Sequence, residues 1–167
     1  MLATALEKEK KGRDFYIESA EKCTNQLGKD IFRMLISEEG IHITRIKEIY
    51  SALQGGKPWS SEWKSHQPDH KNLQELFRKR MRDLGTNVIS DTGDVEAIEV
   101  GLKFEQSAID FYEQGLTKAV EPIEKQFIET MIKEEKMHYA SLADVKQYLT
   151  EPELWMAEME HHSLDGA

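Results

Sequence analysis

The sequence contains few of the residues that interrupt helices and almost none that cross-link a small fold. Its 167 residues include 10 Gly, 4 Pro and 1 Cys. A single cysteine excludes an intramolecular disulfide and a zinc ribbon with paired C-x-x-C motifs, and it fits a reducing compartment. Because helix-forming residues are plentiful while Gly and Pro are scarce, the composition predicts an all-α fold.

Long runs of basic or of apolar residues are also absent. The formal net charge is −9 and no Lys/Arg run offsets it locally, so we expect no nucleic-acid partner. The chain has neither the N-terminal apolar stretch of a signal peptide nor about 18 consecutive apolar residues. We therefore expect a cytoplasmic protein that does not bind membranes.

An internal repeat divides the chain into two matching halves. A shift of 96 residues aligns them without a gap, and it places Glu9 on Glu105 and Glu39 on Glu135. The same shift aligns further pairs, namely Leu6 with Leu102, Tyr16 with Tyr112, Ile36 with Ile132, Glu38 with Glu134, His42 with His138, and Leu53 with Leu149. The sequence therefore predicts a duplicated structural unit.

Each half contains two segments with apolar residues at helical spacing. These segments span about residues 2–23, 35–53, 98–116 and 128–149, so the repeated unit is a helical hairpin. Turn and cap residues fall between the segments, at 25–28, 55–58, 91–94 and Pro122. We predict a four-helix bundle built from two hairpins.

The bundle is expected to occupy residues 1–150, with a long crossover at about 55–90. Residues 55–71 are typical of a loop and residues 72–84 of a shorter helix, and a connection of this length can span the bundle. We expect the second hairpin to run parallel to the first. Residues 151–167 are expected to form a short helix and a tail, which pack on the bundle or on a second subunit.

Charged residues interrupt the apolar stripes that should face the core. Burying several carboxylates together costs on the order of several kcal/mol per ion unless they are protonated or neutralised. A pair of divalent cations would neutralise them, and Glu and His at positions i and i+3 share one helix face. The candidate ligands are Glu9, Glu39, His42, Glu105, Glu135 and His138. The alternative is a duplicated bundle with inert buried polar residues.

The ligand types restrict the choice of metal. Carboxylates with one imidazole per ion suit Fe²⁺ or Mn²⁺, whereas structural zinc prefers thiolates or more imidazoles. We expect two Fe ions, with Mn as the alternative.

The pattern of these ligands resembles the diiron domain of rubrerythrins and the wider ferritin-like superfamily. The resemblance covers roughly residues 2–54 and 94–150. It rests on Glu9 with Tyr16, Glu-Gly-Ile-His at 39–42, Glu105 with Tyr112, and Glu-Lys-Met-His at 135–138.

The resemblance implies roles for the ligands and a reaction. Glu39 and Glu135 would bridge the two metals, and Glu9 and Glu105 would be terminal ligands. The reduced centre would react with hydrogen peroxide or O₂, in peroxide scavenging or ferrous-iron oxidation. The sequence lacks the paired cysteines of a rubredoxin, so an external electron-donor protein such as a rubredoxin is implied, and a homodimer is the expected assembly.

The sequence also departs from the family pattern and leaves other functions open. Rubrerythrins are similar to this chain but carry another carboxylate one turn after the third-helix ligand, where this sequence has Ala108, and Gly12 occupies the matching place. An iron-binding or storage protein of the ferritin-like type is an alternative function. A non-catalytic metal-binding scaffold that interacts through its acidic surface is another.

Residues next to the ligands are candidates for supporting roles. The phenols of Tyr16 and Tyr112 lie one heptad beyond a ligand and are expected to donate hydrogen bonds to ligand carboxylates across the bundle, or else to be ordinary core aromatics. Glu38 and Glu134 lie one step around the helix from the ligands. We expect them at an edge, exposed to solvent or in salt bridges.

Overall fold

The computed structural model confirms an all-helical bundle. It describes residues 1–68 and 70–164, except for the side chains of residues 70–76 and 161–164. This part of the chain contains no strand. The helices are α1 (Leu2–Lys22), α2 (Gln26–Gln54), α3 (His70–Leu84), α4 (Thr92–Leu116), α5 (Pro122–Thr150) and α6 (Pro152–Leu164), with the short 3-10 helix η1 (Glu62–Ser65). None of the described helices has the length and apolar character needed to cross a bilayer.

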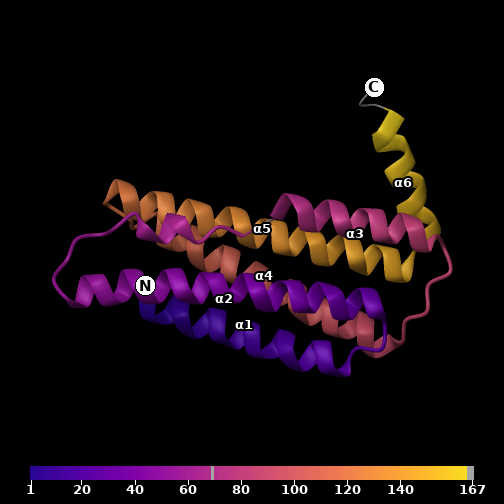
Figure 1. Ribbon diagram of the computed structural model, residues 1–167, viewed down its shortest axis with the longest axis horizontal. Helices are drawn as coiled ribbons and strands as arrows, with labels where there is room; N and C mark the ends of the chain where they lie inside the picture. Colours follow the sequence, from indigo (N-terminus) through magenta and orange to yellow (C-terminus); the bar gives the residue numbers. More distant parts are fainter. Residues whose placement is uncertain (69, 165–167) are drawn as a thin grey trace.

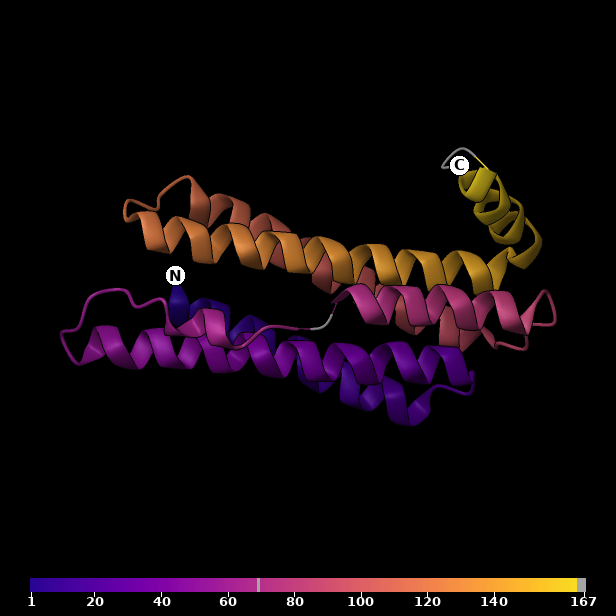
Figure 2. The ribbon, with the colours of Figure 1, turned by 45° about the horizontal axis from the view of Figure 1, so that its top comes forward.

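The two hairpins run in opposite directions, which corrects the parallel arrangement expected from the sequence. Glu9 of α1 contacts Tyr112 of α4, whereas Tyr16 further along α1 contacts Glu105 earlier on α4. The crossover runs the length of the bundle and returns the chain to the end where α2 begins (Figures 1 and 2). Because α4 starts there, it runs in the direction of α2 and antiparallel to α1.

The helix ends follow from local chemistry. Asn25 caps α2 by accepting a hydrogen bond from the backbone N–H of Gly28 at 3.0 Å. The Asp91 carboxylate accepts a hydrogen bond from the Asp94 N–H at 2.9 Å at the start of α4. Pro122 occupies the first turn of α5, where its missing N–H costs nothing. These features confirm the predicted boundaries.

The apolar core consists of two clusters with a polar layer between them. On α2 the first cluster ends at Leu35 and the second begins at Ile46, and on α5 the gap lies between Ile132 and Leu142. Both gaps contain buried charged side chains. The packed clusters on either side leave the side chains of this layer buried, so their electrostatic interactions act at a lowered effective dielectric.

The crossover and the C-terminal helix each anchor on the bundle through a buried tryptophan. Trp63 of η1 packs edge-on against Phe127, with the ring centroids 5.3 Å apart. Trp155 of α6 packs edge-on against Tyr148 at 5.4 Å, although the helix axis leaves the end of the bundle steeply (Figure 1). The homodimer that we expect from the sequence, in which α6 could pack on a second subunit, remains a prediction.

Candidate metal centre

All six predicted ligands meet in the polar layer, and each is at most 3% exposed. They come from every helix of the bundle, with Glu9 on α1, Glu39 and His42 on α2, Glu105 on α4, and Glu135 and His138 on α5. Helical spacing explains the arrangement on α2 and α5, because residues i and i+3 point from the same face.

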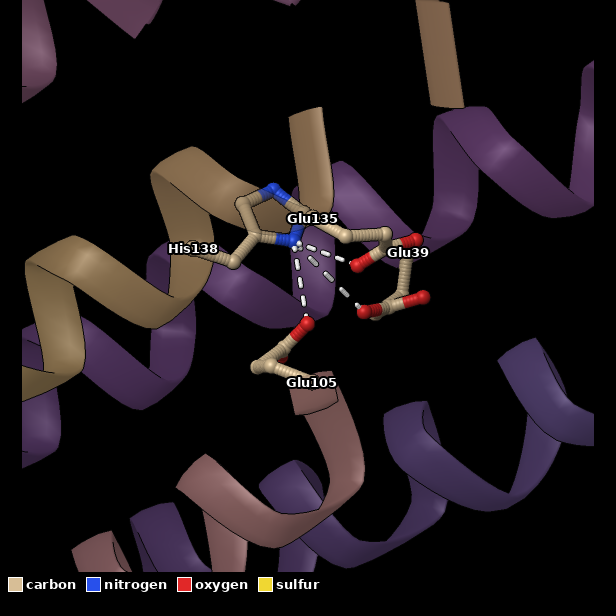
Figure 3. A group of neighbouring side chains, drawn as sticks. All are labelled: Glu39, Glu105, Glu135 and His138. Carbon is tan, nitrogen blue, oxygen red and sulfur yellow. Dashed lines mark ion pairs between the residues drawn. The ribbon is translucent and has the colours of Figure 1, made fainter. Parts of the chain in front are cut away.

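The ligand atoms form two adjoining groups with the spacing of a metal site. One group consists of Glu39, Glu105, Glu135 and His138 (Figure 3), and the other of Glu9, Glu39 and His42. Within each group, one donor atom per residue lies within 4.8 Å of all the others. Glu39 belongs to both groups, so the two positions share at least one carboxylate.

The orientation of two carboxylates links the two positions. Glu135 places Oε1 at 3.2 Å from Nδ1 of His42 and Oε2 at 3.3 Å from Nδ1 of His138. Glu39 does the same at longer range, with Oε2 at 3.7 Å from His42 and Oε1 at 3.9 Å from His138. Each of these carboxylates therefore presents one oxygen to each imidazole.

The other two carboxylates each face one imidazole. Oε2 of Glu9 lies 3.2 Å from Nδ1 of His42, and Oε2 of Glu105 lies 3.6 Å from Nδ1 of His138. The second oxygen of each accepts a hydrogen bond from a buried phenol across the bundle, Tyr112 on Glu9 and Tyr16 on Glu105. These bonds fix the rotamers of the two carboxylates.

The tyrosines remain protonated in this environment. Burial is the largest cause that raises the pKa of both phenols, and for Tyr16 the next is the negative charge of Glu105. A phenol with a raised pKa keeps its proton and acts as a hydrogen-bond donor to a carboxylate.

Behind each imidazole lies a buried carboxylate, which corrects the expectation that Glu38 and Glu134 lie at an edge. Oε2 of Glu134 is 3.0 Å from Nε2 of His42, and Oε2 of Glu38 is 3.7 Å from Nε2 of His138. The imidazoles turn Nδ1 toward the ligand cluster and Nε2 outward, so the outer carboxylates set their orientation.

Arg45 supports one of these outer carboxylates. Its guanidinium is fully buried and places Nη1 at 2.5 Å from Oε2 of Glu134. The same guanidinium donates to the backbone carbonyl of His66 in the crossover, through Nε at 2.7 Å and through Nη2. Sequence analysis missed Arg45, although it follows His42 by three residues and thus shares its face.

Burial and repulsion shift two of the carboxylates, Glu39 and Glu105, toward their neutral forms. Burial raises the pKa of Glu39 well above its usual range, and the charges of Glu9 and Glu135 add to the effect. Burial, followed by the charge of Glu135, raises the pKa of Glu105 to about 8. A divalent cation would displace the protons that relieve this repulsion.

The charge and hydrogen bonding of the cluster fit a cation pair. Burial alone would raise the pKa of Glu135, but His42 and His138 outweigh it and hold that pKa well below the usual range. Both oxygens of Glu135 and Oε2 of Glu39 are buried, and no hydrogen bond to them forms within the described part of the chain. Buried acceptors of this kind call for a further partner, and two divalent ions could supply it.

Comparisons with known proteins agree with this chemistry. A family model described as Rubrerythrin matches residues 1–146, which include the whole polar layer and all six candidate ligands. No curated protein and no solved structure gives a significant match.

Proposed function

The chain belongs to the rubrerythrin family of ferritin-like diiron proteins, and we propose that it is a dimetal oxidoreductase that reduces hydrogen peroxide or O₂. The observation that carries the proposal is the orientation of Glu39 and Glu135, each of which presents one oxygen to each imidazole. This arrangement suits two metal ions held side by side, and two ferrous ions that each give one electron would supply a two-electron reduction.

Each metal would have its own terminal ligands. Glu9 and His42 would hold one ion, Glu105 and His138 the other, and the two central carboxylates would bridge them. A bound ferrous pair would supply the two electrons that reduce a peroxide or O₂. We propose iron as the metal, with Mn as the alternative, because the ligand types accept both.

The surrounding residues would prepare the site for this reaction. The phenolic protons of Tyr16 and Tyr112 orient the terminal carboxylates, and Glu134 orients the imidazole of His42. The apolar clusters pack against the polar layer from both ends, which limits the access of water along the length of the bundle. Reducing equivalents would come from an external electron-donor protein of the rubredoxin type.

The first test is metal content followed by reoxidation. We expect about two iron ions per chain by elemental analysis after anaerobic loading, as the ligand set of such bundles holds a metal pair. After reduction, faster oxidation by hydrogen peroxide than by O₂ would support peroxide scavenging. Faster oxidation by O₂ with consumption of extra Fe²⁺ would instead support ferrous-iron oxidation or storage. A chain that retains no metal would contradict the proposal.

A further inference from the structure

A cavity lies beside the ligand cluster, between α1 and α4. Its volume is about 270 Å³, and three ligand carboxylates line its floor, those of Glu9, Glu39 and Glu105. Neither histidine nor Glu135 lines it. The cavity therefore lies on the side of the cluster opposite the imidazoles, where an incoming molecule reaches the carboxylates directly.

Two small residues at equivalent places in the repeat keep this cavity open. Gly12 on α1 and Ala108 on α4 both line it, and the repeat shift places one on the other. A methyl group added at Gly12 would come no closer than 4.0 Å to the Glu39 carboxylate. Larger side chains at these two places would fill the space above the carboxylates.

The cavity opens to solvent between polar and charged residues, and part of its wall is apolar. Lys11 and Ser107 at its rim are exposed, while the walls include the rings of Phe104 and Tyr16. Lys8 crosses the rim, where its Nζ donates to Ser107 Oγ at 2.9 Å. An apolar wall leading from solvent to a carboxylate floor suits a molecule with a hydrocarbon end and a polar end.

The size of the cavity exceeds what hydrogen peroxide requires. A volume of 270 Å³ corresponds to roughly nine water molecules at about 30 Å³ each. Hydrogen peroxide has only two heavy atoms, whereas a small alkyl hydroperoxide would use the remaining space and contact Phe104 and Ala108.

We propose that this cavity admits small organic hydroperoxides, with the alkyl group against Phe104 and Ala108 and the O–O group toward Glu9, Glu39 and Glu105. The inference rests on the proposed oxidoreductase function and names a further substrate class for the same site. The reduction breaks the O–O bond, takes up two protons and releases an alcohol and water. Its two electrons come from the external electron-donor protein of the proposed function.

The test compares two oxidants on a variant that fills the cavity. Ala108→Leu adds bulk to the wall, and Val100→Leu, at an exposed position of the same helix, is the matched control. Each protein is loaded with iron, reduced, and oxidised with hydrogen peroxide or with tert-butyl hydroperoxide. We expect both oxidants to react with wild type and with the control. Ala108→Leu should lower the rate of oxidation by tert-butyl hydroperoxide about 10–200-fold more than it lowers the rate of oxidation by hydrogen peroxide.

A binding measurement tests the cavity without the reaction. Tert-butyl alcohol, the expected product, is added to zinc-loaded protein, and saturation transfer from protein to alcohol is measured by NMR. We expect transfer with wild type and with Val100→Leu, and its loss with Ala108→Leu. If Ala108→Leu does not fold, Gly12→Ala takes its place, with a smaller selective loss expected.

The outcomes separate this inference from the function on which it rests. The inference is overturned if hydrogen peroxide oxidises wild type but tert-butyl hydroperoxide does not, or if Ala108→Leu slows both oxidants equally. A metal-loaded, reduced wild type that reacts with neither peroxide nor O₂ would contradict the proposed function itself.

Discussion

The two halves of the candidate site have the same ligands but different support behind the imidazoles. On one side, Glu134 lies 3.0 Å from His42 and is held by the buried guanidinium of Arg45. On the other side, Glu38 lies 3.7 Å from His138, and the repeat places Ser141 where Arg45 would be. The repeat therefore reproduces the ligands, the tyrosines and the outer carboxylates, but not the arginine that supports one of those carboxylates.

The crossover explains why the two halves differ. The Arg45 guanidinium also donates a hydrogen bond to the backbone carbonyl of His66, which belongs to the crossover. The crossover occurs once in the chain and has no copy in the second half, so the repeat cannot reproduce this hydrogen bond. Ser141 instead donates its hydroxyl to the backbone carbonyl of Met137 at 2.8 Å, within its own helix.

The largest effect on metal content should come from removing a carboxylate that contacts the imidazoles of both halves. Glu135→Gln should leave the protein with almost no metal, because both imidazoles lose the same charged partner. Glu9→Gln should affect the His42 half alone and leave about one ion per chain. Elemental analysis after identical loading measures both. Equal metal content in the two variants would contradict the bridging role of Glu135.

The next largest effect should come from the buried arginine. Arg45→Met leaves Glu134 as a buried charge without its guanidinium, and removing one partner of such a pair costs about 3–5 kcal/mol. Urea unfolding of the metal-free protein measures the loss. The matched variant Ser141→Ala removes only a hydrogen bond within one helix and should cost below about 1 kcal/mol.

A double variant checks the physical cause of that loss. Adding Glu134→Gln to Arg45→Met removes the charge that has lost its guanidinium, so the two substitutions together should cost less than the sum of their separate effects. Additive costs would mean that Arg45 stabilises the fold through packing alone.

Metal affinity should reveal the same asymmetry on a smaller scale. Removing the carboxylate that accepts a hydrogen bond from a metal-binding imidazole typically lowers the affinity for the metal by about 10–100-fold. Glu134→Gln should lie at the upper end of this range and Glu38→Gln at the lower end, because the first carboxylate is closer to its imidazole. Competition with a chelator measures both affinities, and a larger effect of Glu38→Gln would reverse the comparison.

A further difference between the two halves concerns the turns of the two hairpins. The Asp94 carboxylate ties the first turn to α4 by accepting hydrogen bonds from the backbone N–H groups of Thr24, at 2.8 Å, and Asn25, at 2.9 Å. The second turn is closed locally, by Glu124 accepting from the Val120 N–H at 3.3 Å. Asp94→Asn should therefore cost about 1–3 kcal/mol at neutral pH, as expected for hydrogen bonds to a charged group.

The pH dependence of stability tests this prediction further. Burial of Asp94 opposes its charge, but the hydrogen bonds from Cys23, Thr24 and Asn25 outweigh burial and lower its pKa. A lowered carboxyl pKa adds stability above the unfolded pKa of about 3.9, and that stability is lost as the pH falls through the folded pKa. Unfolding measured from neutral to acid pH should show this loss in wild type and a smaller one in Asp94→Asn.

Most of the fold was predictable because the internal repeat and the helical spacing of apolar residues can be recognised in the sequence itself. The boundaries near Asn25, Asp91 and Pro122 follow from cap and turn chemistry, and the structure confirms them. The relative direction of the hairpins was not predictable in the same way. It depends on where a long crossover delivers the chain, and the expected parallel arrangement was wrong.

The surroundings of the site were harder to predict than the ligands. Position on a helix stripe places Glu39 and His42 at the core, but it also placed Glu38 and Glu134 at an edge, where they do not lie. Their burial depends on imidazoles that reach across from another helix. Arg45 depends in addition on a carbonyl 21 residues later, and such a long-range contact leaves no periodic signal.

The antiparallel register makes the molecule close to a covalent dimer of its own hairpin. Two copies of residues 1–54, paired by the same two-fold rotation, would bring together Glu9, Glu39 and His42 twice and so assemble the same ligand set. In such a symmetric dimer every residue would appear twice. Because both halves lie in one chain, each half can carry its own residues, as Arg45 opposite Ser141 shows.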